Sequence, residues 1–467
     1  MNRSFKRWIV ATAGLTGALA IGLFCGSPAA VAETKAGYTP RPKGTVTFTK
    51  DVAPIVFNNC TSCHRSGEVA PFTLMNYQDV KKRAAQIASV TQSGYMPPWS
   101  AASHGEFENE RILSADQKGL LKQWVEEGTK EGAKKDLPAL PTYTPGWQLG
   151  EPDMIYEPKE SYTLAAEGDD VFRCFVMPTS FGEDKYVAAM EVRPANRKVV
   201  HHIIAYLDQS HSNRGREEKT KDGQIGFNGS PGVGTDGWLG AWAPGYIPRL
   251  APDGVGTLLS KGVDIVMQVH YHKNGKVEKD KTRIGVYFCK KPVDKRLRLL
   301  PIFAPLNIPA GAEDYVTNSI QMPVPTDATV LSVAPHMHLL GKQMDVFAIL
   351  PDGTKKSLVN VPNYDYNWQT SYTYKDPVKI PRGSKVALVA HYDNSTRNLR
   401  NPNSPPKPVG WGEQTTDEMC IGFVSYTMDS EHITKGQAKE DYLEKLLKGM
   451  GNRRKANKSA EVKADGK

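Results

Sequence analysis

The chain has 467 residues, which is enough for about three domains of roughly 100–200 residues each. Its composition, 39% hydrophobic and 23% charged, is ordinary for a soluble globular protein. The formal net charge is +9, but no basic helix or aromatic stacking motif accompanies that charge. We therefore expect no nucleic-acid partner.

Residues 1–32 have the organisation of a secretory signal peptide. A basic start, MNRSFKRW, precedes the apolar run IVATAGLTGALAIGLF, and SPAAVA then offers cleavage after Ala32. Phe24 is too large for the position before a lipoprotein cysteine, which argues against lipid attachment at Cys25. No other apolar run approaches the roughly 20 residues that span a bilayer. We expect a periplasmic or secreted protein with no transmembrane segment after cleavage.

The opposite end of the chain, residues 436–467, is a basic tail. Without the leader the net charge falls to about +6, and much of it lies in GNRRKANKSAEVKADGK. Such a sequence is typical of a solvated, disordered tail. Contact with an anionic membrane surface or an acidic partner is the alternative.

Helical spacing of apolar residues predicts a small all-α domain over residues 45–135. The helical stretches are DVAPIVFNNC, YQDVKKRAAQIASVTQS and SADQKGLLKQWVEEGTKEG, and Ser114 is a plausible start for the last of them. Residues 136–150 then lack periodicity and are rich in proline, which predicts a linker.

From about residue 150 the pattern changes to short alternating runs separated by Gly, Pro, Asn and Asp turns. Examples are KVVHHIIAYL, VDIVMQVHYH, MDVFAIL and KVALVAHYD. This pattern predicts antiparallel β-sandwich or jelly-roll structure. A repeated order of histidine-rich strands divides it into two similar β-domains, residues 151–298 and 299–435.

The sequence CTSCH, from Cys60 to His64, has the form of the c-type haem attachment signal. The thiols of Cys60 and Cys63 would bond to the haem vinyl groups, and His64 would bind the iron. Met96, in the proline-stiffened SGYMPPWS, is the predicted second iron ligand, which would suit electron transfer. A redox or structural CxxC followed by an unrelated histidine is the alternative, as is a core role for Met96 with His104 or an open site in its place.

Histidines are concentrated in the β-type part of the chain. Because alternate strand residues share a face, His336 and His338 should project together, and His270 and His272 could do so as well. His201 and His202 are adjacent, so both can bind one ion only at a β-bulge or strand end. Core packing explains such a set poorly, since each buried imidazole needs partners for both ring nitrogens. Imidazole suits copper, zinc, iron or nickel, and a nearby thioether favours copper. The seven histidines concerned are His201, His202, His270, His272, His336, His338 and His391.

The motifs VHHIIAYL, MQVHYH, PHMHLLGK and TTDEMC occur in this order. They resemble the ligand motifs of the copper type II, ascorbate-dependent monooxygenases, the family of peptidylglycine hydroxylating monooxygenase and dopamine beta-monooxygenase. The resemblance covers about residues 150–435. It implies two jelly-roll domains that each hold one copper ion, facing each other across an open, solvent-filled cleft. It further implies one copper that stores electrons and one that activates O2, with the ligands His201, His202 and His270 for the first and His336, His338 and Met419 for the second.

Several positions depart from the family pattern. Ala334 replaces an arginine of the peptide-hydroxylating members, and Ile421 and Phe423 replace the residues that hold the substrate carboxylate. An anionic peptide would lose its anchors, so a neutral or more apolar substrate is favoured. His391 replaces the usual disulfide partner of Cys420 and should lie near the second copper. Three roles stay open for His391: it could hydrogen-bond to a copper ligand, bind the copper itself, or be only a strand residue that bonds to the backbone.

The resemblance implies a monooxygenase that uses O2 and two copper ions to hydroxylate a C–H bond of a small, non-peptide organic molecule. The leader adds export to this expectation, and CTSCH adds one haem c. A tethered cytochrome would take electrons from an external donor, either a small redox protein or a reductant, and pass them on one at a time. The alternatives are a haem and copper protein that only transfers electrons or binds metal, and an oxidative enzyme in which electrons leave copper for haem. The pairing of Cys174, Cys289 and Cys420 and the role of His272 stay open.

Overall fold

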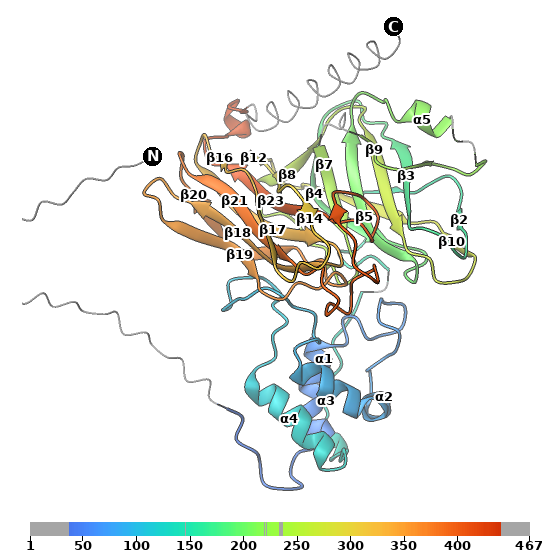
Figure 1. The fold of residues 1–467 in the computed structure, drawn as a ribbon, viewed down its shortest axis with the longest axis vertical. Helices are drawn as coiled ribbons and strands as arrows, with labels where there is room; N and C mark the ends of the chain where they lie inside the picture. The colour runs from blue at the N-terminus through green and yellow to red at the C-terminus, as the bar shows by residue number, and fades with distance from the viewer. Residues whose placement is uncertain (1–36, 145, 219, 221, 233–236, 440–467) are drawn as a thin grey trace, which may run out of the picture. The chain divides into compact units, whose positions relative to one another are not determined.

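The chain folds into a small helical N-terminal region followed by several antiparallel sheets. The computed structural model describes residues 37–439 except 145, 219, 221 and 233–236. Figure 1 shows the helices of the N-terminal region grouped apart from the strands. These helices are η1 (Phe48–Val52), α1 (Ala53–Asn59), α2 (Tyr77–Lys82), α3 (Ala84–Gln92) and α4 (Ala115–Glu126).

The helical region has a core of its own, in which Phe48, Val56 and Trp124 are buried. Helix α4 begins where the sequence predicts, because the Ser114 side chain accepts the Gln117 N–H and the Gln117 side chain accepts the Ser114 N–H. The predicted helices are therefore confirmed, with the middle stretch divided into α2 and α3 at Arg83.

The first group of strands forms a β-sandwich. One sheet has the order β1-β11-β4-β8-β12 and the other β6-β3-β9-β5-β7, and a separate pair joins β10 to β2. Side chains from both sheets, such as Ile203 and Val286, pack in one core. The strands are β1 (Met154–Tyr156), β2 (Tyr162–Leu164), β3 (Val171–Pro178), β4 (Lys185–Arg193), β5 (Val200–Asp208), β6 (Phe227–Asn228), β7 (Gly237–Trp242), β8 (Val255–Leu259), β9 (Asp264–Tyr271), β10 (Glu278–Asp280), β11 (Arg283–Phe288) and β12 (Lys295–Arg296).

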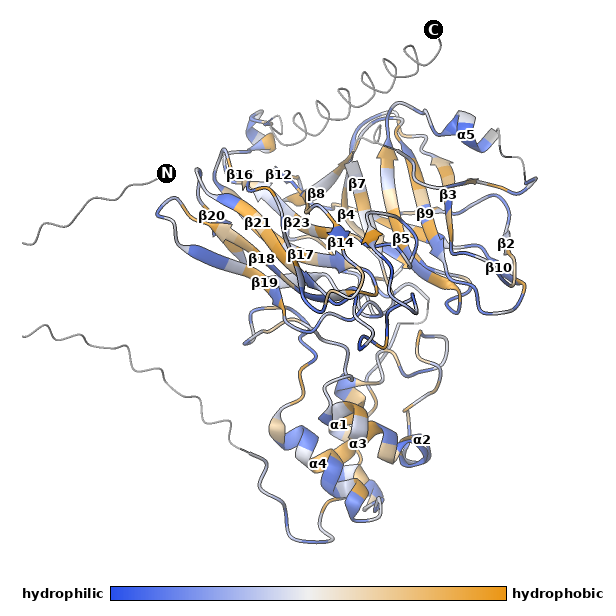
Figure 2. Ribbon diagram, in the orientation of Figure 1, coloured by the Kyte–Doolittle hydropathy of each residue, from blue (hydrophilic) through white to orange (hydrophobic). Residues whose placement is uncertain are grey.

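The second group forms another sandwich, from β13-β23-β17-β20 and from β15-β21-β18-β19 with β16 beside β21. Val333 and Leu388 meet in its core, and Figure 2 shows hydrophobic residues concentrated on strands such as β21 and, in the first sandwich, β9. The strands are β13 (Arg298–Phe303), β14 (Asn307–Ile308), β15 (Tyr315–Asn318), β16 (Met322–Pro323), β17 (Ala328–Met337), β18 (Gly341–Ile349), β19 (Lys355–Val361), β20 (Tyr372–Ile380), β21 (Lys385–Tyr392), β22 (Val409–Gly410) and β23 (Cys420–Met428). The prediction of a mainly antiparallel β protein with a helical start is confirmed.

The predicted linker packs against its neighbours. The Trp147 side chain is buried, and the N–H groups of Gln148 and Leu149 donate to the buried carboxylate of Glu191 on β4. Tyr143 lies under the guanidinium of Arg65. The described residues of the range 136–150 therefore contact both the helical region and β4.

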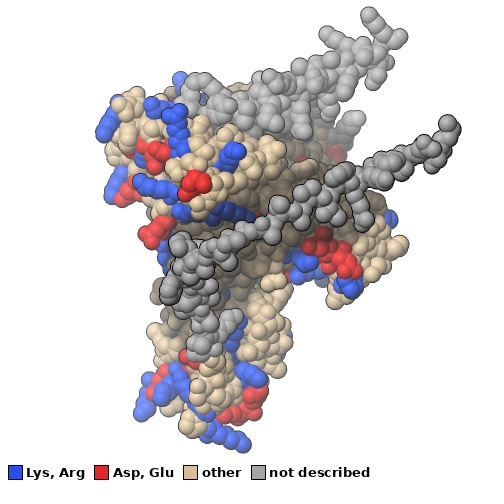
Figure 3. All heavy atoms as spheres, turned by 60° about the vertical axis from the view of Figure 1, so that its left-hand side comes forward, with Lys and Arg blue, Asp and Glu red and all other residues tan. Residues whose placement is uncertain are grey.

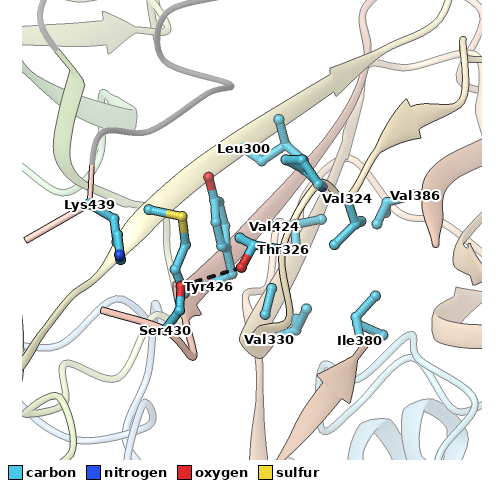
Figure 4. A pocket seen from close by; sticks show the side chains of 13 residues that line it. Leu300, Val324, Thr326, Val330, Ile380, Val386, Val424, Tyr426, Ser430 and Lys439 are labelled. Atoms are coloured by element: carbon cyan, nitrogen blue, oxygen red, sulfur yellow. Dashed lines mark hydrogen bonds between the residues drawn. The ribbon is translucent and has the colours of Figure 1, made fainter. Parts of the chain in front are cut away.

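An apolar cavity of about 310 Å³ lies inside the second sandwich. Figure 4 shows side chains from facing strands, including Val330, Val386 and Val424, around it. Val330 and His336 are six residues apart on β17, which is about 20 Å of strand. The cavity therefore lies at the end of the sandwich away from the histidine pair.

The terminal predictions fall largely outside the described residues. Residues 1–36 and 440–467 include the whole signal peptide and most of the basic tail. Within the described ranges, no helix is long and apolar enough to cross a membrane.

Candidate metal centres

Three histidines of the first sandwich converge on one point. The Nδ1 atoms of His201 and His202 are 3.2 Å apart, and the Nδ1 atoms of His202 and His270 are 3.4 Å apart. Ligand atoms of all three residues lie within 4.8 Å of one another. A cluster of imidazole nitrogens at this spacing fits a transition-metal ion such as copper.

The adjacent pair converges because β5 carries a bulge. Val200 pairs with Tyr271 and His202 pairs with His270, so His201 is the extra residue in the ladder. The bulge turns the His201 ring towards His202 instead of the opposite face. The bulge therefore meets the condition under which His201 and His202 can bind the same ion.

Asp170 orients the third histidine. Its carboxylate Oδ2 lies 2.9 Å from Nε2 of His270, so Nε2 carries the proton and Nδ1 keeps its lone pair for the cluster. The other oxygen, Oδ1, lies 2.9 Å from Nδ1 of His272. These contacts, with that of Thr415, keep the pKa of Asp170 well below its usual value despite burial. His272 shares this carboxylate but its side chain is 65% exposed, and it lies outside the cluster.

The second group of predicted ligands lies at one end of the second sandwich. His336 is on β17, His338 follows that strand, and their ring centroids are 5.3 Å apart. Nδ1 of His336 lies 2.9 Å from the Gln369 side-chain oxygen, and Nδ1 of His338 lies 3.0 Å from the Asp417 carbonyl oxygen. Both contacts place the proton on Nδ1 and leave Nε2 of each ring as a possible ligand atom. Both histidines and Met419 line the same cavity.

Glu418 joins the two segments that carry these residues. The carboxylate is fully buried and accepts the N–H groups of His338, Leu340 and Met419 at 2.8, 2.6 and 3.2 Å. Burial raises its pKa to about 8, although the N–H bonds oppose that shift. The carboxylate thus fixes the backbone on both sides of the candidate site.

Glu418→Gln should lower the free energy of unfolding by about 1–3 kcal/mol, because the amide NH2 would face a backbone N–H. Urea unfolding measures this loss, and Glu413→Gln, which alters a carboxyl without such bonds in the described chain, is the control. Equal stability of Glu418→Gln and the wild type would contradict this role.

The two groups open into one cavity of about 230 Å³ between the sandwiches. The ring centroids of His202 and His336 are 6.0 Å apart. The resemblance implied two sites facing each other across an open, solvent-filled cleft. In the structure the two groups lie close together at this cavity, which is lined largely by apolar and aromatic side chains, such as Trp238, Trp242 and Phe303.

Several contacts hold the two sandwiches together beside this cavity. Tyr366 of the second sandwich stacks on His201 of the first, with ring centroids 4.5 Å apart and planes at 14°. Its hydroxyl lies 3.1 Å from that of Thr415. The Thr415 hydroxyl in turn donates to Asp170. The second sandwich therefore contacts both His201 and the carboxylate that orients His270.

Burial keeps the clustered imidazoles neutral. It lowers the pKa of His336 to about 3 and that of His338 to about 4, and it lowers the pKa values of His201, His202 and His270. Neutral imidazole is the metal-binding form. The structure therefore keeps these residues ready to bind metal at neutral pH.

Metal-free protein should lose stability as the pH falls from 6.5 towards 4. The unfolded histidines take up protons near pH 6.5, whereas folded His338 resists protonation down to about pH 4, so its contribution is present above pH 6.5 and lost below it. For this buried residue the loss is on the order of 3 kcal/mol. Urea unfolding between pH 7 and 4.5 measures it. His338→Asn should show a shallower pH slope than the wild type; equal slopes would refute the account.

The predicted haem segment follows α1. Nδ1 of His64 lies 3.1 Å from the Phe72 carbonyl oxygen, which leaves Nε2 without that proton and suited to bind iron. No disulfide joins the described cysteines, so Cys60 and Cys63 are free thiols. These residues fit a covalently bound haem. Among the described residues, no hydrogen bond joins the Met96 side chain to His64, and its role as second iron ligand stays a prediction.

His391 and Cys420 are explained by the strand pattern. The His391 ring bonds to Asp314, at 3.1 Å, whereas the next residue, Tyr392, points the other way and donates to the Met419 carbonyl oxygen. Cys420 is buried as a free thiol. Of the three readings of His391, the structure supports a strand residue with a surface partner.

Sequence patterns did not identify the groups that orient the histidines. Asp170 and Gln369 lie 100 and 33 residues from the histidines they contact, and Tyr366 belongs to an irregular loop. Glu418 had a partial signal, since it lies inside TTDEMC.

Residues 311–446 match the family model for the copper type II ascorbate-dependent monooxygenase, C-terminal domain. His336, His338 and Met419 fall inside this match, and the three-histidine cluster falls outside it. No curated protein matches the chain. Together, the family match and the cluster of His201, His202 and His270 indicate a copper-dependent monooxygenase.

Solved structures offer only remote likenesses. The major capsid protein P2 from bacteriophage PM2 is 10% identical, with 59% of this chain and 97% of that chain covered and a TM-score of 0.23. A putative alpha-L-fucosidase from Bacteroides ovatus is 7% identical, with coverages of 66% and 43% and a TM-score of 0.17. Likenesses of this size carry no argument about function.

Proposed function

We propose that the chain is an exported copper-dependent monooxygenase that uses O2 to hydroxylate a C–H bond of a small organic molecule, with electrons entering through a covalently bound haem c. The observation that carries this proposal is the shared cavity. His202 of the three-histidine cluster and His336, His338 and Met419 line the same space, and the latter three lie in the segment that matches the monooxygenase domain. Export rests on the leader, with cleavage after Ala32.

The first copper would be bound by Nδ1 of His201, His202 and His270. Their mutual spacing and lowered pKa values support this, because three neutral imidazoles place ligand atoms within 4.8 Å of one another. Asp170 holds the proton of His270 on the far side of its ring. All three ligands are imidazoles, which suit copper. Such a site could keep the same ligands while the copper changes between Cu(I) and Cu(II).

The second copper would be bound by Nε2 of His336 and His338 and by the sulfur of Met419. A thioether favours Cu(I), and the cavity gives O2 and substrate access to the same point. Copper bound there would supply the one-electron chemistry that activates O2. The chain's own residues, Gln369, Asp417 and Glu418, hold the ligands in place.

The haem would be attached at Cys60 and Cys63 and bound by His64, with Met96 as the second ligand. Free thiols and the orientation of the His64 ring support the attachment. Haem held there would supply electrons one at a time, taken from an external redox protein or reductant. We assign residues 45–135 to this cytochrome c-like domain and residues 151–298 and 299–435 to two jelly-roll copper domains.

The cavity lining favours an uncharged, largely apolar substrate. Ala334, Ile421 and Phe423 lie in its wall at the positions where peptide-hydroxylating relatives bind a carboxylate. No Lys or Arg of the described chain lines it, and Glu413 is its one carboxylic acid. Burial raises the pKa of Glu413, which favours the neutral form of this side chain over its charged form.

Anaerobic reduction of copper-loaded protein followed by O2 tests the function. We expect haem reoxidation that is faster with a substrate than without, together with a hydroxylated product. Haem that stays reduced with every compound in a library of neutral aromatic and aliphatic molecules, in protein with two coppers per chain, would favour a non-hydroxylating electron-transfer protein instead.

A further inference from the structure

Four arginines of the described chain lie close to the Cys60–His64 segment or to Glu68, which follows it. Together they carry more N–H donors than the nearby acceptors can bind. Nε of Arg65, Nε of Arg111 and Nη1 of Arg193 are buried and have no hydrogen-bond partner among the described residues. A buried donor left without an acceptor costs about 1–3 kcal/mol, and more when it is charged. The fourth arginine is Arg197.

The carboxylates of the cluster are too few to pair with these groups. Glu68 lies 2.9 Å from Nη1 of Arg197 and 3.2 Å from Arg65, but 3.7 Å from Arg193, which is too long for a hydrogen bond. Glu191 is 3.8 Å from Arg193, and its oxygens already accept two backbone N–H groups and the Tyr287 hydroxyl. The arginines therefore leave donors and positive charge for a further acidic group.

The unsatisfied charge lies next to the haem attachment motif. Burial lowers the pKa values of Arg111 and Arg197, and the Cys63 thiol is among the groups that act on both of them. Arg65 follows His64 directly in the chain. On the face drawn in Figure 3, exposed Lys and Arg side chains alternate with Asp and Glu, so the buried cluster differs from the protein's ordinary surface charge.

Two segments of the chain supply the cluster. Arg65 and Arg111 belong to the helical region, whereas Arg193 ends β4 and Arg197 lies in the connection from β4 to β5. That connection leads into the bulge at His201 within four residues. Arg111 also donates to the Gly245 carbonyl oxygen, at 3.0 Å, on the first sandwich. The cluster is thus built at the junction between the helical region and the strand that carries His201 and His202.

We propose that Arg65, Arg111, Arg193 and Arg197 bind the two propionate groups of the haem attached at Cys60 and Cys63. This rests on the haem of the proposed function. Propionates are carboxylates, and guanidinium groups bind carboxylates through paired N–H donors. Two propionates would supply the missing acceptors. With Glu68 and Glu191 they would also give four negative charges to balance the four guanidinium groups. The carboxylate edge of the haem then rests on the β4–β5 connection, which makes the first sandwich part of the haem site and sets the route by which electrons reach His201.

Arg193→Gln and Arg197→Gln, made in the full chain matured with covalent haem, test the proposal. Loss of a cation beside a propionate favours Fe(III), so each variant should shift the haem midpoint potential downwards. The freed propionate should also regain its ordinary pKa, so the potential should become more dependent on pH between about 5 and 7. Arg197→Lys keeps the charge and should shift the potential less. Arg382→Gln, at an exposed position in the second sandwich, is the matched control and should leave the potential unchanged.

Covalent haem content and thermal unfolding are measured first for every variant. If Arg197→Gln does not fold, Arg193→Gln and Arg197→Lys carry the test. Covalent haem with potentials and pH profiles of both glutamine variants equal to those of Arg382→Gln would overturn the propionate site while leaving the haem assignment intact. Wild-type chain that acquires no covalent haem in a host that matures c-type cytochromes would overturn both.

Discussion

Replacing His270 by alanine should reduce bound copper from two ions per chain to one. The three Nδ1 atoms of the first cluster share one point, and two remaining imidazoles hold copper far more weakly than three. His338→Ala should remove the other ion, because it leaves only His336 and Met419 in the second group. Either variant should lose substrate oxidation to the background level, since the reaction needs both electron storage and O2 activation.

His272→Ala is the matched control for this prediction. His272 occupies the position two residues after His270 and bonds to the same carboxylate, but its side chain is exposed and lies outside the cluster. It should keep two coppers. Metal analysis after gel filtration, with electron paramagnetic resonance to tell the two sites apart, measures the result. Two ions in His270→Ala, or one in His272→Ala, would show that the ligands are assigned wrongly.

Asp170→Asn should weaken copper binding at the first site by about 10–100-fold, the usual effect of losing the group behind a metal-binding histidine. The carboxylate fixes the proton on Nε2 of His270, whereas an amide can present its NH2 instead and move that proton to Nδ1. The same change removes the acceptor for Thr415, so the contact between the sandwiches should loosen as well.

Asp169→Asn makes the same chemical change at the neighbouring, exposed carboxylate and serves as the control. Competition with a copper chelator measures the affinity of the first site once His338→Ala has emptied the second. An unchanged first-site affinity in Asp170→Asn would mean that the tautomer of His270 is set by something other than this carboxylate.

Local patterns in the sequence were sufficient for the histidine geometry. The alternation of strand residues predicts that His336 and His338 point the same way. The adjacency of His201 and His202 allows one shared ion only at a bulge or a strand end, and β5 has a bulge there. The start of helix α4 could be predicted in the same way, because its capping box, Ser114 and Gln117, lies within four consecutive residues.

Contacts between distant segments could not be predicted in the same way. Asp170 reaches His270 across 100 residues, and Tyr366 reaches His201 across 165, with no spacing rule that joins them. The separation of the two groups depends on how the sandwiches pack, so no local pattern could predict the short distance between His202 and His336. The arginine cluster could not be predicted either, because its four members belong to separate segments and no sequence motif shows that their side chains are buried together.

Isotope labelling with 18O2 is the most direct test of a copper monooxygenase at the shared cavity. Copper-loaded, reduced protein is exposed to 18O2 with a library of small neutral compounds, and products are analysed by mass spectrometry. We predict a product with one 18O atom that disappears in His338→Ala and in metal-free protein but persists in His272→Ala. O2 consumption by two-copper protein that yields only peroxide or water, with no 18O in any organic product, would contradict the account.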